Sequence, residues 1–82
     1  MKVKVKGVRS ISIKGEYIKL DSLLKFASIA STGGEAKFLI QSGEVFVNKE
    51  VCIVRGKKIR HGYVIRCGDD VLLIKSNEHR SS

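Results

Sequence analysis

Apolar residues recur at helical spacing in two short segments near the middle of the chain. In the first segment, the apolar positions are Leu20, Leu23, Leu24 and Ala27. In the second, they are Ala36, Leu39 and Ile40. Residues at positions i, i+3 and i+4 lie on one face of an α-helix. We therefore predict two short amphipathic helices whose apolar faces pack against a common core.

Polar residues and glycine predict where the second helix begins and ends. Thr32-Gly33-Gly34-Glu35 has the form of a capping box. In this motif the Thr32 hydroxyl accepts a hydrogen bond from the Glu35 amide, and the Glu35 carboxylate accepts one from the Thr32 amide. Gly43 can adopt the positive φ that ends a helix. We therefore expect the second helix to lie between Thr32 and Gly43.

Alternation of apolar and polar residues predicts β-strands on both sides of the helices. We expect a β segment at 11–18 and, after the helices, a hairpin that turns at Asn48-Lys49. Asn tolerates the left-handed backbone that such a turn requires. The returning strand is expected to continue through residues 51–53. Two further strands are expected at 63–67 and 71–74, joined by Gly68-Asp69-Asp70.

The predicted elements indicate a small α+β domain. We expect the two short helices to pack on one side of a small, mostly antiparallel sheet, within one domain that spans residues 1–82. Lysines alternate with valines in residues 1–9, a pattern that fits either a basic edge strand or an arm. Residues 76–82 are polar, so we expect a frayed tail.

Positive charge is the strongest compositional signal. Sixteen Lys and Arg against eight Asp and Glu give a formal net charge of +8. Such a surplus favours a polyanionic partner, either nucleic acid or an anionic membrane. A basic protein kept soluble by its charge is the alternative, but the distribution argues against it. The basic residues before Lys19 all precede the first acid, Glu16, and residues 55–60 contain no acid.

Few residues suit metal binding or catalysis. Cys52, Cys67, His61 and His79 are the conventional soft metal ligands, and they have neither CxxC spacing nor a His pair, so we expect no metal and no cofactor. We expect the cysteines to stay reduced within strands, with a cross-strand disulfide as the alternative. The chain has no plausible carboxylate pair, no Ser-His-Asp pattern and no cofactor motif. We therefore expect no enzymatic activity and no small-molecule substrate, with His61 as a loop residue.

The chain has no apolar run near the roughly 20 residues that span a bilayer. Its first residues also have no apolar segment of signal-peptide length. A cytoplasmic protein is the expectation from these patterns. The amphipathic segments are short and needed for the core, which argues against a membrane partner.

Within residues 18–65 the order of residues resembles a known RNA-binding domain. The matching positions are Lys19-Leu20-Asp21, Leu24, Glu35-Ala36, Leu39-Ile40, Gly43, Val45, Val47-Asn48 and Gly62. They resemble the domain named after the fourth protein of the small ribosomal subunit, also called the alpha-L RNA-binding motif. The similarity is greatest to a free-standing small bacterial subgroup related to YaaA and YbcJ. The resemblance implies binding to ribosomal RNA, to a transfer-RNA-like structured RNA, or to a ribosomal subunit.

The chain departs from this family pattern at three places. Many members have Ser-Arg where this chain has Thr32-Gly33, and a Gly where it has Lys49. Tyr63 replaces the usual Asp after Gly62. Without the family's arginine, a phosphate contact at the start of the second helix would come from backbone amides.

We predict that exposed residues of the helix pair and the following loops form one basic RNA-binding surface. Lys25, Lys37 and Gln41 lie off the apolar stripes, and residues 55–58 form a basic loop. The predicted RNA-binding residues are Lys19, Lys25, Thr32, Gly33, Gly34, Lys37, Gln41, Lys49, Arg55, Lys57, Lys58 and Arg60. Such a surface reads helix shape and phosphate position more than base identity. The alternative is a basic adaptor that binds an acidic protein or an anionic membrane surface.

The three phenylalanines also lie off the apolar stripes. They are Phe26, Phe38 and Phe46. They can stack on bases, but we expect at least two of them to complete the core.

Overall fold

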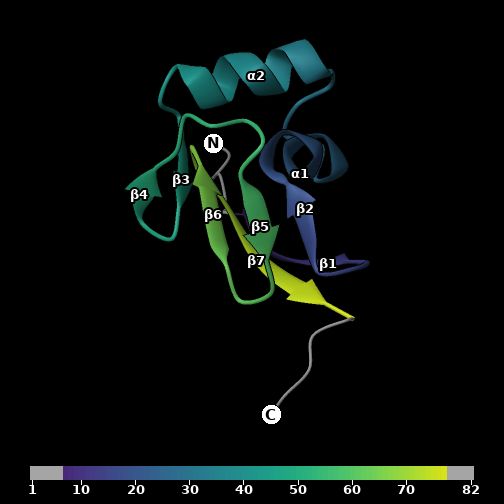
Figure 1. Ribbon diagram of the computed structural model, residues 1–82. Helices are drawn as coiled ribbons and strands as arrows, with labels where there is room; N and C mark the ends of the chain where they lie inside the picture. Colours follow the sequence, from purple (N-terminus) through teal and green to yellow (C-terminus); the bar gives the residue numbers. More distant parts are fainter. Residues whose placement is uncertain (1–6, 78–82) are drawn as a thin grey trace, which may run out of the picture.

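The computed structural model describes residues 7–77. Along the chain they form β1 (Gly7–Ile13), β2 (Tyr17–Lys19), α1 (Leu20–Phe26), α2 (Gly33–Gln41), β3 (Val45–Val47), β4 (Glu50–Val51), β5 (Lys58–Arg60), β6 (Val64–Cys67) and β7 (Asp70–Ser76). Five strands form one sheet in the order β1-β7-β6-β3-β4, and β2 pairs with β5 in a separate two-stranded ladder. Helix α2 lies across one end of the sheet, and α1 follows directly from β2 (Figure 1). The predicted α+β class is confirmed.

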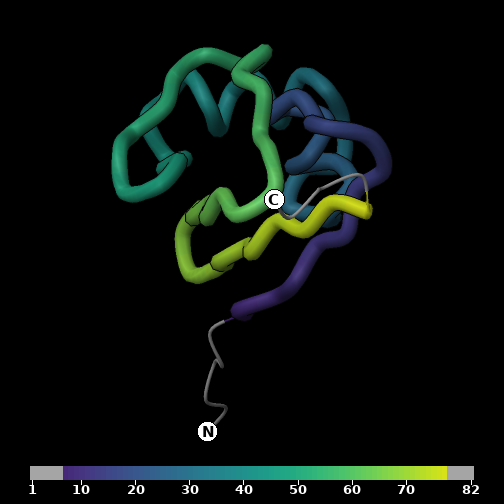
Figure 2. Tube along the Cα trace, turned by 60° about the horizontal axis from the view of Figure 1, so that its bottom comes forward, coloured from purple at the N-terminus to yellow at the C-terminus, as the bar shows by residue number. Residues whose placement is uncertain are grey.

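All strand pairs are antiparallel except β1 with β7. These two strands run side by side along their whole length, with Gly7 opposite Asp70 and Ile13 opposite Ser76 (Figure 2). The pairing joins the first and last strands of the described chain, so no local turn signal predicts it. Edge strand β1 begins with residues 7–9 of the predicted basic arm, and residues 1–6 and 78–82 lie outside the described part.

The core is aliphatic, and both helices and both sheets contribute side chains to it. The fully buried large side chains are Leu20, Leu23, Leu24, Ile40, Val45, Ile59, Ile65, Leu72 and Ile74. Burying one such side chain contributes about 1.5–3 kcal/mol relative to leaving it in water. Both predicted helical stripes face this core, which confirms them, although Leu39 is only partly buried.

The capping box forms with one difference from the prediction. The Thr32 hydroxyl accepts a hydrogen bond from the Glu35 amide at 3.1 Å, as predicted. The Glu35 carboxylate instead accepts from the amide of Ser31, at 2.6 Å, one residue earlier than expected. Thr32 has an extended backbone (φ −137°, ψ 166°). The amide that the Glu35 carboxylate caps is therefore that of Ser31, the residue before Thr32.

The turns follow the sequence signals. Gly43 has a φ of 84° after α2, and Asn48 and Lys49 have φ values of 51° and 77°. Positive φ at both central residues gives the hairpin turn whose twist matches its strands. The Asn48 side chain also accepts a hydrogen bond from the Val64 amide at 2.8 Å, which ties the turn to β6.

Three strand predictions need correction. The expected segment 11–18 is split by a bend at Gly15 (φ 83°) into strands that belong to different sheets. The returning hairpin strand is regular only as far as Val51, and although the Cys52 amide still donates to the Val45 carbonyl at 2.9 Å, residues 53–57 then cross to β5 (Figure 2). Lys58, predicted in a loop, is the first residue of β5. Among residues 7–77, no helix has the length and apolar character to cross a membrane.

Candidate nucleic-acid interface

The β2–β5 ladder concentrates positive charge on its outer side. Lys19 lies opposite Lys58 and Tyr17 lies opposite Arg60, while Ile59 points inward and is fully buried. The Lys58 Nζ is 4.9 Å, and the Arg60 guanidinium carbon 5.5 Å, from the centre of the Tyr17 ring. We call Tyr17, Lys19, Lys58 and Arg60 the basic ribbon. Like charges directly opposite one another destabilise a ladder, so the stability of the fold does not account for the pairing of Lys19 with Lys58.

The loop before β5 is held against the start of α1. The Leu20 amide donates to the Lys57 carbonyl at 2.9 Å, and the Asp21 amide donates to the Arg55 carbonyl at 3.1 Å. The Arg55 Nε also donates to the Asp21 carboxylate at 3.2 Å. These bonds satisfy amides that a helix start otherwise leaves unpaired. They also hold the exposed side chains of Arg55 and Lys57 beside the basic ribbon.

Lys25 extends this positive region along α1. It is exposed and lies one turn after Asp21, so both residues lie on the same side of the helix. The loop that follows leads to the start of α2 (Figure 1).

The start of α2 offers unpaired backbone donors. Among residues 7–77, the amides of Gly33 and Gly34 have no protein acceptor. A side chain at Gly33 would meet nothing within 4 Å, so the backbone there is open to a ligand. Lys37 and Gln41 are exposed one turn apart on α2, as predicted. The negative carboxylate of Glu35 lies at the same helix start and repels an anion. The positive charge of Lys37 offsets this repulsion for any anion that binds here.

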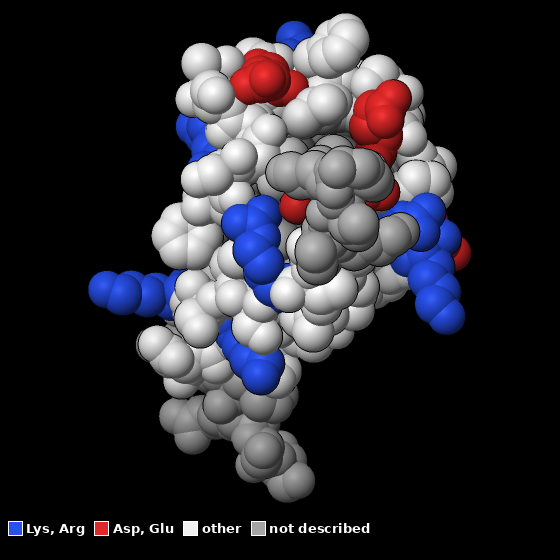
Figure 3. Space-filling view, turned by 180° about the vertical axis from the view of Figure 1, so that it is seen from behind, with Lys and Arg blue, Asp and Glu red and all other residues white. Residues whose placement is uncertain are grey.

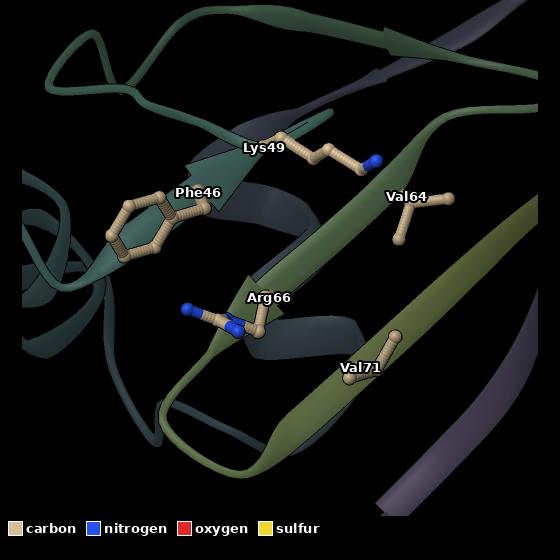
Figure 4. A pocket seen from close by; sticks show the side chains of 5 residues that line it. All are labelled: Phe46, Lys49, Val64, Arg66 and Val71. Carbon is tan, nitrogen blue, oxygen red and sulfur yellow. The ribbon is translucent and has the colours of Figure 1, made fainter.

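Lys49 is the predicted site residue that the structure places elsewhere. It lies in the β3–β4 turn and lines a cavity together with Phe46, Val64, Arg66 and Val71 (Figure 4). None of these four partners belongs to the basic ribbon or to the two helices.

The prediction that at least two phenylalanines complete the core is wrong. Phe26 and Phe38 are 62% and 69% exposed, and Phe46 is only partly buried. Aliphatic side chains from both helices and the sheets already fill the core. Phe38 lies two residues from both Ala36 and Ile40, the buried residues of α2, and therefore points away from the core.

The residues predicted from the sequence omit two that take part in contacts between a cation and an aromatic ring, Tyr17 and Arg66. Tyr17 lies under Lys58 and Arg60, and the Arg66 guanidinium carbon is 5.1 Å from the centre of the Phe46 ring. Both lie in predicted strands, and the sequence predicts no binding role for either. The alternation of Arg66 with buried Ile65 and Cys67 is the signal that marks it as outward-facing.

The reverse side of the molecule carries charges of both signs among residues 7–77. In Figure 3, several Lys and Arg side chains stand apart, others touch one another at the right edge, and acidic side chains lie near the top and farther down. In the basic ribbon, by contrast, every charged residue is a cation.

The described chain has two free cysteines. Cys52 is half-buried and Cys67 is buried. Burial raises the pKa of the Cys67 thiol, and the negative charges of Glu44 and Asp70 raise it further. Within residues 7–77, no three His, Cys, Asp or Glu side chains are grouped to hold a metal ion. His61 lies in the turn after β5 and accepts a hydrogen bond from the Ser76 amide at 3.1 Å; His79 lies outside the described residues.

Comparison with known proteins identifies the family. The family model described as S4 domain matches residues 11–75, which is most of the chain. This chain belongs to the S4 domain family. The match confirms the RNA-binding domain that the sequence resembled, and it extends beyond residues 18–65 at both ends. The S4 domain is also 42% identical over 55 residues to the probable ribosome maturation protein RlbA of Bacillus subtilis (strain 168), covering 67% of this chain and 78% of that protein.

Proposed function

We propose that this S4 domain is a non-catalytic protein that binds structured ribosomal RNA through its phosphate backbone. The observation that carries the proposal is the basic ribbon, in which Lys19 faces Lys58 and two cations lie against Tyr17. The similarity to a protein named for ribosome maturation supports ribosomal RNA as the target. With this target, the protein acts in the cytoplasm.

The geometry suits an extended polyanion better than a small anion. The basic ribbon, the Arg55–Lys57 loop and Lys25 lie around the junction of β2 with α1, and α2 adds Lys37 with the open amides of Gly33 and Gly34. Cations spread over several elements can contact successive phosphates of a paired RNA, whose bases stay out of reach in the deep groove. The Tyr17 ring holds two cationic side chains in place, which lowers the entropy lost on binding.

Salt dependence of RNA binding tests the proposal. If about four to six phosphates are neutralised, a plot of log K against log salt has a slope of roughly −3 to −5. We expect this slope in fluorescence anisotropy titrations with a labelled ribosomal RNA hairpin. A flat salt dependence contradicts phosphate binding.

A matched pair of variants tests the surface itself. Arg60→Glu removes a cation of the basic ribbon, and Lys75→Glu makes the same change of net charge at the exposed residue of β7. We expect Arg60→Glu to weaken hairpin binding about tenfold or more, because a charge-assisted contact is lost, and Lys75→Glu to have little effect. Equal weakening by both variants would show that only bulk charge matters. Retention on anionic vesicles without competition by RNA would instead support the adaptor alternative.

A further inference from the structure

The face of the five-stranded sheet opposite the core carries a row of outward-pointing residues. The strand register places Phe46 of β3 opposite Arg66 of β6, Arg66 opposite Val71 of β7, and Val71 opposite Val8 of β1. Residues at alternate positions, such as Val45 and others of the core, point to the other face. Val8 is 60% exposed. This face is therefore an open, largely apolar surface separate from the basic ribbon.

A cavity of about 430 Å³ lies on this face. Figure 4 shows that its five side chains project from the same side of the sheet, with Val64 and Val71 on neighbouring strands forming an apolar floor. Phe46 and Arg66 lie together at one end, with the guanidinium carbon 5.1 Å from the ring centre. The Lys49 side chain extends over β6 at the other end. The volume falls within the range of about 300–1,000 Å³ that is typical of small-ligand sites.

Among residues 7–77, the charge lining this cavity has one sign. Arg66 and Lys49 are the charged lining residues of that part of the chain, and no Asp or Glu of it lines the cavity. The Arg66 side chain has no carboxylate partner among residues 7–77 and lies against an aromatic ring. A ligand that fits this lining combines a flat apolar part with negative charge.

An unpaired nucleotide has this combination. Its base can stack on an aromatic ring or on a guanidinium plane, and its phosphate can pair with a cation. We propose that the outer sheet face is a second RNA-binding site, which takes an unpaired nucleotide of a single-stranded segment. The choice of RNA as the polyanion rests on the proposed function, whereas the site itself shares no residue with the basic ribbon. An S4 domain with both surfaces can hold the junction between a paired and an unpaired region.

The experiment compares two RNA probes on the same variants. The probes are a fluorescein-labelled oligouridylate of about ten nucleotides and the ribosomal RNA hairpin, whose nucleotides lie nearly all in its paired stem, both followed by anisotropy. Phe46→Leu keeps an apolar side chain but removes the ring, and Arg66→Gln removes the cation. We expect each variant to weaken oligouridylate binding about five- to tenfold and to change hairpin binding by less than about twofold. Lys14→Gln, the same charge loss in the exposed turn before β2, is the control for Arg66→Gln.

Folding of each variant is checked by thermal unfolding, and Arg66→Gln keeps the test valid if Phe46→Leu does not fold. Unchanged oligouridylate affinity in the folded variants overturns the second site, as does equal weakening by Lys14→Gln. Loss of hairpin binding together with oligouridylate binding also overturns it, because the two surfaces would then be one. If the second site fails while Arg60→Glu still weakens the hairpin, the proposed function stands. If Arg60→Glu has no effect on the hairpin, the proposed function fails whatever the sheet face does.

Discussion

Replacing Lys19 by Glu separates what the basic ribbon does for stability from what it does for binding. Lys19 ends β2, lies directly opposite Lys58, and is the residue immediately before α1. Lys19→Glu turns a repulsive cross-strand pair into an attractive one. It also places a negative charge at the positive end of a helix. We therefore expect the variant to be more stable than the natural protein and to bind RNA more weakly.

The size of both effects follows from the geometry. A cross-strand charge pair contributes about 0.2–1 kcal/mol, and a carboxylate at a helix start about 0.3–1 kcal/mol at low ionic strength. Because Lys19 is exposed, salt screens both contributions. We expect the free energy of unfolding to rise by about 0.5–2 kcal/mol at low salt. A domain of this size gains about 4–8 °C in Tm for each kcal/mol. Losing one phosphate contact weakens RNA binding about tenfold or more and makes the salt slope less negative by about one.

Urea unfolding and hairpin anisotropy measure the two effects on the same preparation. The double variant Lys19→Glu with Lys58→Glu restores a like-charge pair, so a double-mutant cycle that also includes the single variant Lys58→Glu isolates the cross-strand contribution. We expect the double variant to lose that part of the stability gain and to bind RNA more weakly still. A Lys19→Glu variant that is less stable at low salt would refute the electrostatic reasoning. Unchanged hairpin affinity would remove Lys19 from the binding surface.

Three other predictions concern α2 and the buried thiol. Lys37→Glu should weaken binding to every structured RNA tested by about tenfold, since it reverses the cation beside the open amides of α2; normal binding in anisotropy titrations would exclude this helix from the surface. Thr32→Ala should lower the free energy of unfolding by about 1 kcal/mol in urea titrations, because the Glu35 amide loses its cap; unchanged stability would mean that this bond contributes nothing. The pKa of Cys67 is raised above its ordinary value of 9.0 by burial, so the folded state holds the proton to higher pH than the unfolded state. The stability that the protonated Cys67 thiol contributes is therefore complete below pH 9.0 and is lost as pH rises through the folded pKa. The free energy of unfolding of Cys67→Ala should therefore fall less steeply at alkaline pH. An identical fall in both proteins would contradict the assignment.

Local patterns in the sequence predict the helices and turns because local physics determines them. Leu20, Leu23 and Leu24 recur at helical spacing and are fully buried. Thr32 and Asn48 act through bonds or backbone angles within a few residues of their own position. The parallel pairing of β1 with β7 is different, because it joins segments some sixty residues apart, such as Gly7 with Asp70. No turn residue in the sequence predicts this pairing.

The candidate surface is predictable in composition but not in arrangement. Sequence reasoning named Lys58 and Arg60 but placed Lys58 in a loop, because three residues are too few to show the alternation of β5. The pairing of β5 with β2 therefore brings Lys19 and Tyr17 to these cations without any local signal. Lys49 is exposed and basic like the others, yet the fold places it on the cavity of the outer sheet face.

Amide chemical-shift mapping by NMR tests the central claim most directly. A ¹⁵N-labelled sample is titrated with the same RNA hairpin, and each backbone amide reports whether its surroundings change. The account predicts the largest changes together at residues 17–25, 33–37 and 55–60, with little change in β6 and β7. Changes spread evenly over the surface, or centred on strands β6 and β7, would contradict an RNA-binding surface built on the basic ribbon.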